Sequence, residues 1–130
     1  MRISPKIWER MAVLAWEAAR HARLYGKTAV GATVIAKDGR LFAGCNVEHR
    51  FRSHDIHAEV NALSTMVAAG AGPAVALIVV AKRKRFTPCG SCLDWVFELG
   101  GGDCRVAFQA TPGGKIRLYR SSQLMPHYPE

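Results

Sequence analysis

The alternation of apolar and polar positions along the chain predicts three helices and five strands. Apolar residues recur at helical spacing in three segments: 6–25, 57–69 and 89–99. Short apolar runs predict strands at 30–36, 41–47, 75–81, 105–109 and 115–119. Because helices alternate with apolar strands, we expect a sheet covered on both faces. The predicted fold class is therefore α/β, with three α/β/α layers around a mixed five-stranded sheet.

Local signals place the boundaries of these elements. Ser4 and Pro5 suit the start of the first helix, and Gly26 suits its end. The segment 37–40, with Asp-Gly at its centre, predicts a hairpin turn between the first two strands. The polar segment 48–56 reads as a loop, and Asp55 is a candidate cap for the second helix.

One uncharged run, residues 62–81, is long enough to test as a membrane span. The sequence Gly70-Ala71-Gly72-Pro73 interrupts it, so we interpret it as the end of a helix followed by a separate strand. The first residues show no secretory signal. We therefore expect a soluble, cytoplasmic protein with no membrane association.

Length and composition fit one globular domain spanning residues 1–130. Apolar residues make up 49% and charged residues 22%, and the four cysteines are too few for a disulfide scaffold. The net charge of +8 is compatible with an anionic partner such as nucleic acid or phosphate. Charge alone does not identify that partner, and we consider nucleic acid unlikely.

The residues with the clearest chemical meaning lie at two predicted helix starts: His57 and Glu59 at one, Cys89 and Cys92 at the other. One imidazole and two thiolates can hold Zn²⁺ and leave its fourth position open. A nearby carboxylate such as Glu59 can then move the proton of a water bound there. Helix starts stabilise anions, so we also expect lowered pKa values for both thiols.

Other interpretations of the same residues remain open. A Cys-x-x-Cys pair alone also occurs in redox sites and in structural zinc sites. A structural site would need a fourth protein ligand, for which His54, Cys45 and His49 are the candidates. Cys45 and Cys104 are otherwise expected to be small buried residues that the metal does not need.

The pattern H-x-E followed by P-C-x-x-C is the signature of zinc nucleobase deaminases, and the chain resembles the cytidine deaminase family over most of its length. The resemblance rests on three segments: 44–48, 57–62 and 87–92. It implies a cytidine deaminase-like fold, with Asn46 and Glu48 binding the ribose 3′-hydroxyl. The tail 124–128 resembles the family's ending, in which a late aromatic residue reaches a neighbouring subunit, so a homotetramer is also implied.

The chain departs from the family's small tetrameric members at three linked positions. His57 stands where they usually have Cys, while Val60 and Leu93 stand where they often have Arg. One imidazole and two thiolates leave the zinc centre formally neutral, so a buried unpaired arginine would be costly. We interpret the three differences as one coherent change.

The predicted activity is that of a zinc-dependent hydrolase in pyrimidine salvage, converting cytidine or deoxycytidine to the uracil nucleoside and ammonia. Thr28 and Arg52 replace aromatic residues of the family, so a modified cytosine nucleoside of the blasticidin type, or a cytosine nucleotide, stays open. Phe51 could supply stacking, and Arg50, Arg52 and His54 could meet an anion. The basic run 82–85 could be a solvated rim. A polynucleotide deaminase and a non-catalytic zinc module are the remaining alternatives.

Overall fold

The structure is a computed structural model in which residues 1–129 are described. Its elements are, in chain order, α1 Pro5–Ala19, β1 Gly31–Ala36, β2 Leu41–Cys45, the short 3-10 helix η1 Arg52–His54, α2 Ala58–Ala68, β3 Ala74–Val80, α3 Gly90–Gly100, β4 Arg105–Gln109, β5 Ile116–Arg120 and α4 Ser121–Leu124.

The five strands form one sheet in the order β2-β1-β3-β4-β5. β3 and β4 are parallel and are connected through α3, whereas every other neighbouring pair is antiparallel. A parallel pair needs such a crossover, while the β1–β2 hairpin needs only the tight turn that Gly39 completes with a φ of 90°. The predicted mixed five-stranded sheet is confirmed.

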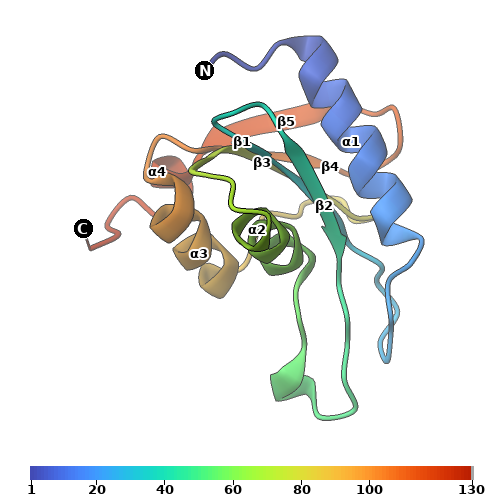
Figure 1. Cartoon of the computed structure of the whole chain (residues 1–130). Helices are drawn as coiled ribbons and strands as arrows, with labels where there is room; N and C mark the ends of the chain where they lie inside the picture. The colour runs from blue at the N-terminus through green and yellow to red at the C-terminus, as the bar shows by residue number, and fades with distance from the viewer. Residues whose placement is uncertain (130) are drawn as a thin grey trace.

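Helices cover both faces of the sheet. Figure 1 shows α1 on one side and α2 and α3 on the other. Trp8, Met11 and Ile78 belong to the core beneath α1, and Leu63 and Phe108 belong to the core on the opposite face. Because the sheet is buried on both sides, all six residues of β1 are buried. The predicted α/β/α layering is confirmed.

Two glycines allow helices to approach the sheet closely. A Cβ atom at Gly31 would lie 1.8 Å from the carbonyl oxygen of Ala15 in α1. A Cβ atom at Gly44 would lie 2.6 Å from the side-chain oxygen of Asn61 in α2. Neither distance is possible between real atoms, so both contacts require a residue without a side chain.

The first helix is shorter than predicted, because it ends at Ala19 rather than near Tyr25. Beyond it, the Arg23 N–H donates to the carbonyl oxygen of Asn46, and the Glu48 N–H donates to the carbonyl oxygen of Arg23. These bonds to a distant segment satisfy the backbone groups that another helical turn would have used. The helical spacing of apolar residues continues past this point, which is why the prediction was wrong.

The uncharged run 62–81 is divided as predicted. α2 ends at Ala68 and β3 begins at Ala74. Between them, Gly70 and Gly72 adopt φ values of 71° and 142°, which favour glycine. Within residues 1–129, no helix is both long and apolar enough to cross a lipid bilayer.

Candidate active site

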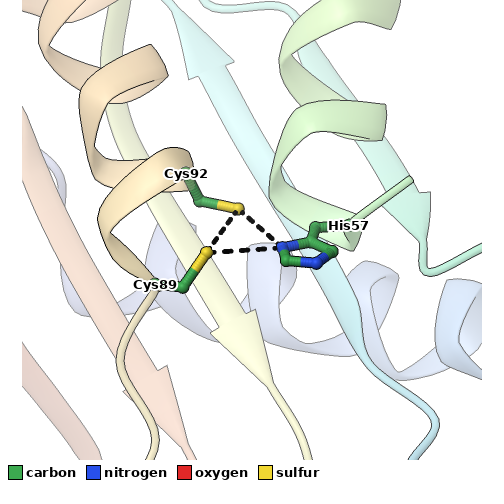
Figure 2. A group of neighbouring side chains, drawn as sticks. All are labelled: His57, Cys89 and Cys92. Atoms are coloured by element: carbon green, nitrogen blue, oxygen red, sulfur yellow. Dashed lines mark hydrogen bonds between the residues drawn. The ribbon is translucent and has the colours of Figure 1, made fainter. Parts of the chain in front are cut away.

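His57, Cys89 and Cys92 come together in a group that could hold a metal ion (Figure 2). The His57 Nδ1 atom lies 3.2 Å from the Cys92 sulfur and 3.4 Å from the Cys89 sulfur, and the sulfurs are 3.6 Å apart. Tetrahedral Zn²⁺ with ordinary bond lengths sets such atoms about 3.5–3.8 Å apart. The donor types and their spacing therefore fit zinc with only small adjustments.

Two helix starts supply these three side chains. His57 is the N-cap residue of α2, Cys89 is the N-cap residue of α3, and Cys92 lies in the first turn of α3. Neither N-cap side chain bonds the backbone of its own helix. The imidazole and the thiol are consequently directed toward each other across the gap between α2 and α3, as Figure 2 shows.

The alternative of a closed structural site gains no support. Among residues 1–129, no fourth His, Cys, Asp or Glu joins the group, so His54, Cys45 and His49 stay outside it. Cys104 is buried as expected, whereas Cys45 is only partly buried.

The expected lowering of both thiol pKa values is wrong for Cys92. Burial raises the pKa of the Cys92 thiol, and the nearby Glu59 and Cys89 raise it further. Desolvation of a thiolate in this packed position outweighs the partial positive charge of the helix start. Binding a metal cation would therefore require Cys92 to release a proton.

Glu59 lies beside this group in the first turn of α2 and is only 3% exposed. Burial raises the pKa of the Glu59 carboxyl, while His57 and a hydrogen bond from the Cys92 thiol act in the opposite direction. A raised pKa makes a carboxylate a stronger base, which favours its acceptance of a proton during catalysis. This is the property that a proton carrier needs.

Asn46 follows β2, is 7% exposed, and holds the segment before β1 in place. Its side-chain oxygen accepts a hydrogen bond from the Val30 N–H at 2.9 Å. Its side-chain nitrogen donates to the carbonyl oxygen of Thr28 at 3.0 Å. An amide has one further donor and one further acceptor position, so Asn46 can still bind a ligand.

Glu48 is 9% exposed and has a partner on each carboxylate oxygen. Oε1 accepts hydrogen bonds from the N–H groups of Tyr25 and Gly26, each at 2.7 Å, and Oε2 lies 2.8 Å from Nη2 of Arg52. The Gly26 hydrogen bond is the main cause that lowers the pKa of Glu48, with further lowering from Tyr25 and Arg52. Glu48 is thus held as an ionised acceptor.

One cavity of about 490 Å³ brings these groups together. Asn46, Glu48, His57, Glu59 and Cys89 all line it. A larger hollow of about 1040 Å³ lies beside α1 and the β4–β5 turn, but none of these five residues lines that space. The smaller cavity is the candidate active site, because chemistry requires the reactive groups to face the same space.

Comparison with known proteins agrees with this geometry. The family described as "Cytidine and deoxycytidylate deaminase zinc-binding region" matches residues 5–108 of the chain. The chain belongs to this deaminase family. As a member of it, the protein is a hydrolytic aminohydrolase with the zinc-binding domain that the family description names.

Two cytidine deaminases illustrate the similarity within the family. The chain is 36% identical to the cytidine deaminase of Sporosarcina psychrophila over 103 residues, which cover 78% of this chain and 75% of the relative. Against the cytidine deaminase of Halalkalibacterium halodurans the identity is 34%, covering 78% of this chain and 77% of the relative.

The fold agrees as well. The crystal structure of cytidine deaminase from Burkholderia pseudomallei superposes with a TM-score of 0.83 at 31% identity, covering 91% of this chain and 95% of that one. The cytidine deaminase-like fold is confirmed.

Sequence patterns missed some residues around the deaminase site. Tyr25 and Gly26 bind Glu48 through backbone N–H groups, and a pattern of side chains does not predict such contacts. Phe86 lines the cavity, and its place three residues before Cys89 was the available signal. Phe51, which we considered for stacking, is 61% exposed and lies among His49 and His54 instead.

The loop before α2 also differs from expectation. Asp55 does not cap α2, because His57 occupies the N-cap position. Asp55 instead accepts hydrogen bonds from the His49 N–H and from Nε of Arg52, both at 2.8 Å. Arg52 therefore joins the two carboxylates Glu48 and Asp55, which reduces its capacity to bind an external anion.

Proposed function

We propose that this protein deaminates cytosine nucleosides, converting cytidine or deoxycytidine and water to uridine or deoxyuridine and ammonia. The observation that carries the proposal is the arrangement of the cavity. A metal-binding group and a buried carboxyl occupy one part of it, and Asn46 and Glu48 occupy another. The cytidine deaminase relatives support the same chemistry.

In this proposal His57, Cys89 and Cys92 are the zinc ligands. Zn²⁺ bound there would supply a Lewis acid that lowers the pKa of a water molecule in its open position. A neutral imidazole and two thiolates give the centre no net charge. Val60 and the buried Leu93 are apolar neighbours in sequence that suit such a centre.

Glu59 is proposed as the proton carrier. The attacking water gives a proton to Glu59, which passes it to N3 of the cytosine ring as the oxygen bonds to C4. Glu59 next takes the remaining proton of the oxygen now bonded to C4 and gives it to the amine. The C4–N bond breaks as the C4 carbonyl forms, and the amine leaves as ammonia. The raised pKa of Glu59 suits this exchange, because its carboxylate must take up and release a proton in each cycle.

Asn46 and Glu48 are proposed to bind the sugar. An ionised Glu48 accepts a hydrogen bond from a hydroxyl but cannot donate one. The resemblance to the cytidine deaminase family assigns the ribose 3′-hydroxyl as that partner. Asn46 offers its remaining N–H to the same hydroxyl. Both residues are held by backbone groups before substrate binds, so little ordering is needed on binding.

We further propose one cytoplasmic deaminase domain over residues 1–130, assembled as a homotetramer and acting in pyrimidine salvage. The family-like tail supports the assembly. Within the single chain, the Tyr128 ring stacks on Phe97 with centroids 4.1 Å apart. Analytical ultracentrifugation tests the assembly directly, and a monomer over the micromolar range would contradict it.

The function is tested by measuring zinc content and ammonia release with the purified chain. The substrates are cytosine, cytidine, deoxycytidine, their monophosphates and cytosine-nucleoside antibiotics. We expect bound zinc and turnover of cytidine or deoxycytidine. Turnover of free cytosine without any nucleoside would contradict the sugar roles of Asn46 and Glu48. Full zinc occupancy without any turnover would instead indicate a non-catalytic zinc module.

A further inference from the structure

Three arginines and three carboxylates line the cavity, but they are not paired one to one. Three arginines line it: Arg52, Arg83 and Arg85. Arg52 is paired with both Glu48 and Asp55. In the part of the chain that the structure describes, no ion pair includes Arg83 or Arg85. Two guanidinium groups thus face a binding cavity without a protein anion beside them.

Contacts at the cavity wall hold Arg83 near the proposed sugar site. Its guanidinium lies over the Phe86 ring, 5.5 Å from the ring centroid, and its Nη2 atom is 3.4 Å from the hydroxyl oxygen of Thr28. The carbonyl oxygen of the same Thr28 accepts the hydrogen bond from Asn46. Thr28 therefore connects Arg83 to Asn46, which is proposed to bind the sugar.

Acidic and basic side chains lie on different walls of the cavity. One wall carries Glu48 and Asp55, which share the single guanidinium of Arg52, so the acidic charge there exceeds the basic charge and disfavours a further anion. Another wall carries no carboxylate and is formed by Thr28, Arg83, Arg85, Phe86 and Thr87. An anionic substituent on a bound nucleoside would be stabilised at this second wall and destabilised at the first.

We propose that Arg83 and Arg85 bind an anionic group at the 5′ position of the substrate's sugar. This inference rests on the proposed deaminase function. With the 3′-hydroxyl at Asn46 and Glu48, the 5′ carbon is attached to the adjacent ring carbon and can turn toward the arginine wall. Guanidinium groups bind phosphate and carboxylate oxygens through paired hydrogen bonds. A phosphate monoester and a 5′-carboxylate share this chemistry, and the experiment separates them.

The test compares cytidine, cytidine 5′-monophosphate and cytidine 5′-carboxylate as substrates of the zinc-loaded chain. We expect at least one anion to exceed cytidine in kcat/KM. The anion that does so shows whether the site binds a phosphate or a carboxylate. In Arg83→Gln/Arg85→Gln, the ratio of kcat/KM for that anion to kcat/KM for cytidine should fall roughly tenfold, because two charged contacts from exposed side chains are lost. A ratio that stays at the wild-type value would overturn the inference.

A matched control is available in the same loop. Lys82→Gln/Lys84→Gln removes the same charge, but neither lysine lines the candidate active site. We expect the control to retain the wild-type ratio. An equal fall in both double variants would contradict the inference, because it would show an effect of net charge rather than of contact.

Binding to Glu59→Gln separates this inference from the proposed function. Calorimetry on that variant should show the preferred anion binding at least several-fold more tightly than cytidine, with the difference lost when Arg83 and Arg85 are also replaced. Equal affinities would overturn the anion site even if cytidine is turned over. Tighter binding of a cytosine-containing single-stranded oligonucleotide than of both anions would also overturn it, in favour of a polynucleotide. If the wild-type chain turns over none of the substrates but this binding pattern is seen, only the proposed reaction is contradicted and the anion site stands.

Discussion

Glu59 and Glu48 line the same cavity, yet their surroundings shift their pKa values in opposite directions. Glu59 lies on the first turn of a helix and is buried, so its pKa is raised. Glu48 lies on an irregular segment and accepts hydrogen bonds from Gly26 and Tyr25, so its pKa is lowered. The comparison shows how one cavity can hold a carboxyl suited to proton transfer and another suited to permanent hydrogen-bond acceptance.

The two regions are also built differently. We call the area around His57, Glu59, Cys89 and Cys92 the floor, and the segments 23–28 and 46–55 the rim. The floor depends on two helix starts that pack against the sheet. The rim depends on hydrogen bonds between irregular segments, and in Figure 1 the segment between β2 and α2 extends away from the sheet. Damage to the floor should therefore remove the reaction, whereas damage to the rim should mainly weaken binding.

The largest expected effect comes from removing a proposed metal ligand from the floor. Cys92→Ala should lose bound zinc and all measurable deamination, because two remaining ligands hold zinc poorly. Metal analysis and ammonia release measure both results. Cys104→Ala is the matched control, since Cys104 is equally buried but lies outside the metal group. Full zinc occupancy in Cys92→Ala would show that this cysteine is not a ligand.

The next effect separates the two carboxylates. Glu59→Gln should retain zinc and lose about 10²–10⁴ in kcat, the usual contribution of general acid–base catalysis. Glu48→Gln should chiefly raise KM, since the amide keeps the shape but loses the charge. Steady-state kinetics on both variants, with circular dichroism as a check of folding, measures the contrast. Identical losses in kcat would mean that the division between floor and rim is wrong.

The smallest effect concerns the ion pair that supports Glu48 in the rim. Arg52→Met should raise KM by up to about tenfold, since an exposed ion pair contributes little by itself. Arg52 helps to keep the pKa of Glu48 low, so the wild-type carboxylate stays ionised as the pH falls. Without Arg52 that pKa rises, and kcat/KM should decline at a higher pH than in the wild type. Arg52→Lys should restore part of the difference, and an unchanged pH profile would exclude this positioning role.

The floor could be predicted from sequence to a large extent. The pattern H-x-E followed by P-C-x-x-C joins His57 to Cys89 and Cys92, and local signals place both motifs at helix starts. The structure brings the three side chains within bonding range of one metal ion. Local spacing predicts where each ligand lies on its helix, whereas the meeting of the two helix starts follows from the deaminase pattern.

The rim could be predicted only in part, because its contacts join distant segments. Nothing in the sequence near Arg23 signals pairing with residues 46–48, so the first helix was extended too far. Asp55 has the residue type and position of a helix cap, but it bonds to His49 and Arg52 instead. Such choices depend on which groups tertiary packing brings near, which a one-dimensional pattern does not contain.

The close contact at Gly44 connects the two regions. The Asn61 side chain of α2 rests against Gly44 and accepts a hydrogen bond from the N–H of Cys45, the residue before Asn46. A hydrogen atom at this point of β2 thus fixes the distance from the helix that carries Glu59 to the strand that leads to Asn46. Any larger substituent would push the helix outward and lengthen the span between Glu59 and Asn46, the proposed base and sugar contacts. If the cavity binds a nucleoside as proposed, the size that fits is set partly outside the cavity, at a residue that the nucleoside need not touch.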